Sequence, residues 1–301
     1  MFSAHKSRII HIASLLLFTF AFVLQARAEN YSDLWSNPNE PGWGVAIADH
    51  QSDMFAVFLT YDQNNRPTWL VMPGGEMSAD RLHFNAAIYR STGPAFTTTP
   101  YDPTLVTVTQ AGVADFDFAP ADLGPGQARF TYTIDGITRS KAMERQAFGS
   151  APANWGFDMT DLWWNPDMSG TAVSITQHGD TAFAIVLNYD IDGAPLFSVL
   201  PDATRNALGG FNGRLYTATG PYFGAETYDA TLFSVQEVGQ GGVYPLQVQE
   251  AKGFDINSEC PCAPLSAQVQ VTLRDVPISS DLVPLPFGEM TTQATTKARA
   301  R

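Results

Sequence analysis

The sequence has few charged residues, few cysteines and no long apolar run beyond its first segment. Charged residues make up 16% of the 301 positions, and 17 Lys and Arg stand against 30 Asp and Glu, a formal net charge of −13. Low charge combined with 45% hydrophobic residues excludes an intrinsically disordered chain. The acidic balance argues against a nucleic-acid partner. The 24 Gly, 20 Pro and 12% aromatic residues argue against a coiled coil or a helical bundle.

Only two cysteines occur, Cys260 and Cys262, and a single proline separates them. A disulfide between them would close a very small, strained ring. A labile disulfide, an intermolecular bridge and two free thiols therefore stay open. Two thiolates make a poor zinc site because four ligands are usual. The sequence also has no phosphate-binding loop that would indicate a nucleotide cofactor. We expect no metal and no cofactor.

The first 28 residues have the pattern of an export signal. Lys6 and Arg8 precede an almost wholly apolar run from Ile9 to Leu24, and Ala26-Arg27-Ala28 matches a signal-peptidase site. The run is shorter than the roughly 20 residues that span a bilayer. This favours cleavage after Ala28 over a retained anchor. We expect a periplasmic or secreted protein with no transmembrane segment after cleavage.

Most of the sequence consists of two copies of an internal repeat. The segment Asp33-Leu34-Trp35-Ser36-Asn37-Pro38 returns 128 positions later as Asp161-Leu162-Trp163-Trp164-Asn165-Pro166. After a one-residue deletion, Thr92-Gly93-Pro94 matches Thr219-Gly220-Pro221. A repeat of this length indicates a duplicated domain. We expect one domain over residues 29–150, a second over 151–289, and a disordered tail over 290–301.

Each copy has the pattern of short strands joined by turns. Residues 129–134 alternate between apolar and polar, and Asp135-Gly136 is typical of a hairpin turn. About seven or eight strands in each copy predict an all-β fold. We expect two tandem antiparallel β domains, each a small up-and-down barrel or a sandwich. The strands expected in the first copy are 44–48, 54–61, 67–72, 82–89, 105–109, 114–118, 129–134 and 137–143.

The repeated motifs resemble a module found singly or in tandem in secreted proteins of Gram-negative bacteria. Its usual pattern is roughly D-L-W-W-N-P-x-E-S-G-W-G, then T-Y-D-x-x-G-x-P-x-W-L, then Y-x-x-T-G-P. Most members are uncharacterised, so the resemblance implies export and a repeated β domain but no activity. The first copy departs little from the pattern, with Pro41 where Ser is common. The second departs more, with Met168, Thr171 and Phe197 where the pattern has Glu, Trp and Trp.

Comparison of the two copies singles out candidate ligand-binding residues in the first. Trp43 becomes Thr171, a change that a tight core would not tolerate without repacking. Trp43 is therefore a candidate exposed aromatic that stacks on a sugar or anchors a partner. The alternative is that Trp43 packs on the end of the domain. The full candidate set is Trp35, Glu40, Trp43, His50, Tyr61 and Asp62.

Several of these residues also have plain structural interpretations. Trp35 matches Trp163, which favours a structural role, and His50 adjoins a turn in both copies. Asp62 follows Tyr61 in a turn-like segment, where an aspartate caps its own backbone. No nucleophile elbow and no His-Glu-x-x-His motif is present. We therefore assign no catalytic residue.

The sequence favours an exported, non-catalytic binding or accessory protein. Its ligand would be a glycan, a small apolar molecule held in a barrel mouth, or another protein. Two alternatives stay open. One is a secreted hydrolase with an unfamiliar site that uses His50 or a carboxylate such as Asp62. The other is a structural protein of the envelope or surface.

Overall fold

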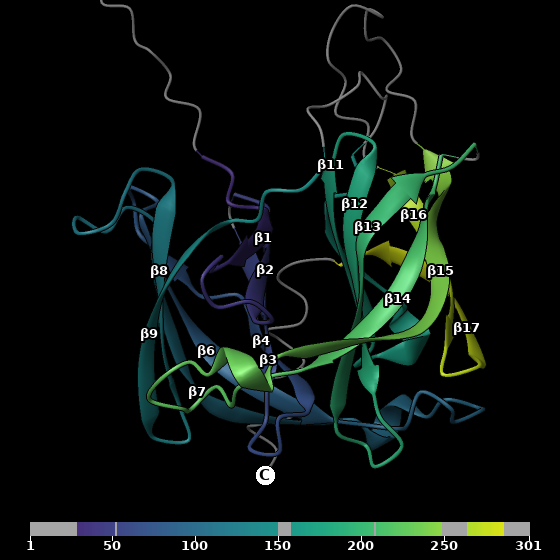
Figure 1. The fold of residues 1–301 in the computed structure, drawn as a ribbon. Helices are drawn as coiled ribbons and strands as arrows, with labels where there is room; N and C mark the ends of the chain where they lie inside the picture. Colours follow the sequence, from purple (N-terminus) through teal and green to yellow (C-terminus); the bar gives the residue numbers. More distant parts are fainter. Residues whose placement is uncertain (1–28, 52, 150–157, 208, 249–263, 286–301) are drawn as a thin grey trace, which may run out of the picture.

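The computed structural model describes residues 29–51, 53–149, 158–207, 209–248 and 264–285, and these form two antiparallel β units (Figure 1). Each unit corresponds to one copy of the repeat, which confirms the expected all-β fold with two β domains. Within these ranges no helix has the length and apolar character needed to cross a membrane. The expected leader, the domain boundary at 150, the two cysteines and the tail lie outside the described residues.

The first copy closes into a ring of eight strands. β1 pairs with β2 on one side and with β9 on the other, and β4 pairs with β6 at Val71 and Tyr89. The two-residue strand β5 (Glu76–Met77) pairs with β6, and the short 3-10 turn η1 (Pro103–Leu105) precedes β7. The ring strands are β1 (Asp33–Ser36), β2 (Gly44–Asp49), β3 (Met54–Tyr61), β4 (Pro67–Pro73), β6 (His83–Thr92), β7 (Thr107–Asp117), β8 (Gln127–Ile134) and β9 (Ile137–Arg145).

The second copy is a closed barrel of eight strands in sequential order. Of the two expected architectures, the domain is therefore a barrel and not a sandwich. Two 3-10 turns, η2 (Pro166–Met168) and η3 (Ala230–Leu232), precede β11 and β15. The strands are β10 (Asp161–Trp164), β11 (Ala172–His178), β12 (Thr181–Tyr189), β13 (Pro195–Arg205), β14 (Phe211–Thr219), β15 (Ser234–Val248), β16 (Pro264–Leu273) and β17 (Val276–Pro284).

Two local expectations are corrected. β7 is one continuous strand where we expected two, at 105–109 and 114–118. The apparent break is a β-bulge, because Ile88 faces Gly112 while Tyr89 faces Gln110, which leaves Ala111 as the extra residue. β1 was not expected as a strand at all, since its four residues carry no visible alternation.

The two barrels are filled differently. Strand register places Phe116 and Phe130 of the first barrel at the positions of Val243 and Val269 in the second. All four side chains are buried. The first barrel therefore has an aromatic core, while the second is closed with smaller aliphatic groups.

The strands that face the other barrel are buried on both sides. All residues of β2 and β3 are buried, although alternate side chains of a barrel strand point outward. Their outward side chains join those of β11, β12 and β13 in a separate apolar cluster between the barrels, which includes Val57, Leu59, Ile185 and Leu187. The molecule thus has three cores, one in each barrel and one shared.

Candidate functional site

Each barrel sends one segment across to the other. We call residues 93–106 the first arm and residues 220–233 the second arm. They follow β6 and β14, at matching positions of the repeat. Figure 1 shows the second arm, in green, reaching across the blue barrel, and the first arm, in blue, reaching under the second barrel. Each copy thus contributes to the end of the other.

The arms are held by matching hydrogen bonds in both directions. Amide and hydroxyl donors of each arm bond to carbonyl oxygens of the opposite barrel, and each bond has a counterpart in the other copy. The matched bonds are Phe96 N to Tyr189 O (2.9 Å) with Phe223 N to Tyr61 O (3.1 Å), Gly93 N to Gly193 O with Gly220 N to Asn65 O (both 3.2 Å), and the Tyr101 hydroxyl to Ser169 O with the Tyr228 hydroxyl to Pro41 O. This reciprocity gives the two copies a pseudo-twofold relation.

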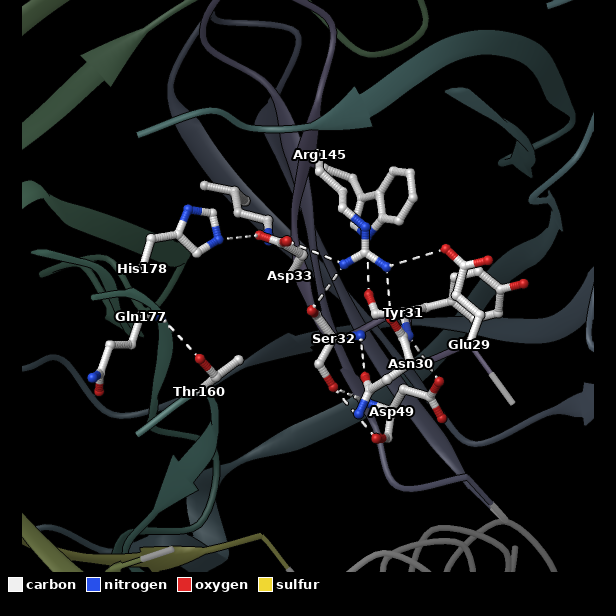
Figure 2. A network of polar contacts seen from close by, with 12 residues as sticks. Glu29, Asn30, Tyr31, Ser32, Asp33, Asp49, Arg145, Thr160, Gln177 and His178 are labelled. Carbon is white, nitrogen blue, oxygen red and sulfur yellow. Dashed lines mark hydrogen bonds and ion pairs between the residues drawn. The ribbon is translucent and has the colours of Figure 1, made fainter. Parts of the chain in front are cut away.

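The two repeated histidines take part in the same symmetry. His50 Nε2 lies 3.1 Å from the Asp161 carboxylate. His178 Nε2 lies 3.2 Å from the Asp33 carboxylate, a pair that Figure 2 shows. Such His–carboxylate pairs are what the hydrolase alternative required. Both pairs, however, join one barrel to the other, and none of these four residues lines the pocket described below.

Figure 2 shows that Asp33 also belongs to a network around Arg145. The Arg145 guanidinium donates to Asp33 Oδ2 at 3.1 Å, to Ser32 O at 3.2 Å and to Asn30 O at 2.6 Å. The bonds of Arg145 join residues 30–33, at the beginning of the first barrel, to β9. Through His178 it also reaches the second barrel.

A pocket of about 110 Å³ lies at the end of the first barrel, where the second arm covers it. Its wall comes from both copies of the repeat. The first barrel contributes Glu40, Trp43, Arg139 and Lys141, among others, and the second arm contributes Tyr222 and Tyr228.

An ion pair lies against aromatic rings on the barrel side of the pocket. Lys141 Nζ is 2.5 Å from Glu40 Oε2, which also accepts a hydrogen bond from Trp43 Nε1 at 2.9 Å. The ammonium group lies 5.0 Å from the centre of the Trp43 ring and 5.9 Å from that of Tyr228. Both distances are within the range of cation–π attraction. The side chain of Trp43 is thereby fixed.

Arg139 and Tyr132 fasten the second arm over the pocket. Arg139 donates from Nε to Ala225 O at 2.8 Å and from Nη2 to Gly224 O at 2.5 Å. The buried Tyr132 hydroxyl donates to Phe223 O at 2.7 Å. These contacts have no counterpart in the pseudo-twofold scheme, so the second arm is held by more bonds than the first.

Three tyrosines in or beside the pocket, Tyr61, Tyr132 and Tyr228, stay protonated over a wide pH range. Burial raises the pKa of Tyr61 and of Tyr132 far above the ordinary value. Burial, followed by the charge of Glu40, also raises the pKa of Tyr228. Their hydroxyl groups therefore remain hydrogen-bond donors, as the 2.7 Å bond from Tyr61 to Gly42 O requires.

The second barrel lacks this polar wall. Glu40 and Trp43 correspond to Met168 and Thr171 in the repeat. Strand register equates Lys141 with Ser280 and Arg139 with Ile278, since Phe130 faces Lys141 as Val269 faces Ser280. Where the first barrel has an ion pair, the second has Ser280 Oγ 3.7 Å from Met168 Sδ. The polar pocket is a property of the first copy alone among these matched positions.

The structure brings three of the six candidate residues together: Glu40, Trp43 and Tyr61 all line the pocket. Trp43 is only 6% exposed, so it packs at the barrel end and is not an exposed platform. The other three lie elsewhere. Trp35 is buried in the first core and donates to Tyr31 O, His50 lies between the barrels, and Asp62 caps its turn through the amides of Asn64 and Arg66.

Sequence comparison missed Arg139, Lys141 and Tyr228. Tyr228 lies in a matched segment, but Tyr101 occupies the same place in the other copy, so no difference drew attention to it. Arg139 and Lys141 lie beyond the point at which the two copies cease to align. The only sequence signal for them is the number of basic residues in β9, the second strand of the last hairpin in the first copy.

No group of three or more His, Cys, Asp or Glu side chains among the described residues is placed to hold a metal ion. Comparison of the chain with protein-family models, with curated proteins and with solved structures finds no match. Functional inference therefore rests on the geometry of the pocket.

Proposed function

We propose that this chain is an exported, non-catalytic binding protein whose ligand occupies the pocket under the second arm. We also infer that it belongs with the secreted repeat modules that its motifs resemble, and that it acts in the periplasm or outside the cell. The polar and aromatic wall formed by Glu40, Trp43, Lys141 and Tyr228 supports a ligand that combines polar groups with a flat or apolar face.

The observation that carries this proposal is the difference between two barrels of common design. The second barrel closes its end with Met168, Thr171 and Ser280. A partly buried ion pair is no general requirement for stability, because well-packed apolar groups of similar volume often replace such pairs without loss. The first copy retains the pair where the pocket opens, which points to a role in binding.

The size of the pocket limits the ligand. A volume of about 110 Å³ admits a small molecule or the end of a larger one. Glu40 is committed to Lys141 and Trp43, so it acts as a fixed hydrogen-bond acceptor in the wall. A monosaccharide unit that enters this pocket in part, alone or at the end of a glycan, has the required mixture of hydroxyl groups and an apolar ring face.

The test gives the first barrel the residues that occupy the corresponding positions of the second barrel. The mature chain and its Glu40→Met, Lys141→Ser variant are titrated with neutral and acidic monosaccharides and with small apolar molecules, and tryptophan fluorescence is recorded. Trp43 reports on the pocket directly because it contacts both substituted residues. We expect a saturable change in the native chain and its loss in the variant.

The matched control is Met168→Leu with Ser280→Ala, at the corresponding positions of the second barrel. It should leave the titration unchanged. A response that persists in the Glu40→Met, Lys141→Ser variant would place the ligand elsewhere. A native chain that responds to no member of the panel would overturn the proposal that the pocket binds small molecules.

A further inference from the structure

Arg139 differs from the other basic side chains of the protein. Every other Lys and Arg in the part of the chain that the structure describes has a carboxylate within ion-pair distance. Arg139 has none among the residues that the structure describes, although the chain carries many more acidic than basic residues. A partly buried guanidinium without a counter-charge is costly unless something else compensates it.

Backbone carbonyls compensate Arg139 only in part. A guanidinium has five N–H donors. Arg139 uses Nε for Ala225 O, Nη2 for Gly224 O and Nη1 for Thr138 O. Two donors remain, one on each terminal nitrogen. Two adjacent N–H groups match the two oxygens of a carboxylate.

The charges around Arg139 do not cancel it. Lys141 and Glu40 neutralise each other at 2.5 Å, and the other carboxylate that lines the pocket, that of Glu226, is exposed to solvent. The interior of the pocket thus carries one uncompensated positive charge. Tyr222 and Tyr228 of the second arm line the same pocket.

We propose that the pocket recognises a small polar ligand through a carboxylate group, which Arg139 binds while the neighbouring tyrosines contact the body of the ligand. This inference rests on the proposed function and specifies its ligand. A uronic acid, with a carboxylate on a sugar ring, is the simplest ligand of this class. Arg139 then has two tasks, because it holds the second arm with two donors and the ligand with two, while its fifth donor bonds Thr138 O of its own strand.

The experiment uses three probes on the mature chain: D-glucuronate, D-glucose, which lacks the carboxylate, and acetate, which lacks the ring. Binding is measured by calorimetry at low and high salt. We expect D-glucuronate to bind at least about tenfold more tightly than D-glucose, since a charged hydrogen bond is lost with the carboxylate. Acetate should compete with D-glucuronate, and salt should weaken both.

The decisive variant is Arg139→Gln, with Arg129→Gln as a matched control in the same barrel, on a partly exposed arginine paired with Asp122. Arg139→Gln should abolish the preference for D-glucuronate over D-glucose, and Arg129→Gln should leave it intact. Because Arg139 also fastens the arm, Arg139→Lys provides a second variant that keeps the charge. It should retain part of the preference.

The outcomes separate the two proposals. Equal binding of D-glucose and D-glucuronate would overturn the carboxylate inference and leave a binding pocket in place. A preference for D-glucuronate that survives in a folded Arg139→Gln variant would also overturn the role of Arg139. Failure of all three probes, with a response to other members of the wider panel, would reject the carboxylate class alone. Failure of every molecule would reject the proposed function as well.

Discussion

A single hydroxyl group, that of Tyr132, bonds the interior of the first barrel to the arm of the second. It is fully buried and donates to Phe223 O, while Val271 occupies the corresponding place in the second barrel. Tyr132→Phe would leave that carbonyl without its buried partner. We expect the free energy of unfolding to fall by about 1–2 kcal/mol, measured by urea denaturation.

The comparison for this variant is Tyr222→Phe. The Tyr222 hydroxyl accepts only a long, exposed bond of 3.5 Å from Gln63. Its loss should change stability by less than about 0.5 kcal/mol. Equal effects of the two substitutions would show that the Tyr132 hydroxyl does not hold the arm.

Tyr189 makes stability depend on alkaline pH. Burial raises its pKa to about 12, with a smaller opposing effect of the hydrogen bond to Ser91. Its stabilising contribution is complete below the unfolded value of about 10 and is lost as pH rises towards 12, because the unfolded state releases the proton first. In that window Tyr189→Phe should show a shallower fall of stability with pH than the native chain. Parallel curves would contradict the burial effect.

At the residue scale, comparison of the copies located part of the pocket. The change from Trp43 to Thr171 marked the position at which the two barrels differ, and Glu40 changed with it. The same comparison did not reveal that Trp43 is buried, since sequence does not tell a packed indole from an exposed one. It also did not reveal that each repeated histidine pairs with an aspartate of the opposite copy. The histidine and the aspartate recur in both copies, and the repeat alone does not show that the pairs form between copies.

The glycines of the two Thr-Gly-Pro motifs set how closely each arm approaches the other barrel. A Cβ at Gly220 would overlap the ring of Tyr61, and a Cβ at Gly93 would overlap that of Tyr189. Gly220→Ala and Gly93→Ala should each lower the free energy of unfolding by about 1–3 kcal/mol through overpacking. Thermal and urea denaturation measure both effects.

The control at this scale is Gly124→Ala, because a Cβ there would meet only the flexible side chain of Gln127. It should be close to neutral. If Gly220→Ala were equally neutral, the second arm would have room to move away from Tyr61 at no cost, and the tight approach would not be a source of stability.

At the scale of elements, strands bounded by clear turns were predictable and interrupted ones were not. The hairpin turn at Asp135-Gly136 has both residues at positive φ, 50° and 79°, as its sequence indicated. β7 was divided because Gly112 interrupts the pattern, whereas the structure uses that glycine where a Cβ would collide with Thr133 O. The arms have no periodicity of their own, since the opposite barrel determines their course.

At the scale of the molecule, duplication predicted two similar barrels but not how they associate. The shared motifs have a second meaning that a single sequence does not display. Tyr61, Gly93, His50 and Asp33 recur because each copy uses them to bind the other. A duplicated domain that kept only its internal core would have no reason to repeat these contacts.

The two copies share the apolar core between the barrels. The outward side chains of β3 and β12 are buried only because the two copies face each other, so a copy alone would expose a large apolar patch. Segments 29–149 and 158–285, produced separately, should each be aggregation-prone or self-associated. Mixed, they should form a one-to-one complex with about the mass expected for both, as measured by light scattering after gel filtration.

The same mixture with Gly93→Ala and Gly220→Ala in the two segments should associate more weakly, because both arms are displaced. Two stable monomers that ignore each other would show that the reciprocal arms depend on the covalent link and do not by themselves bind the two copies.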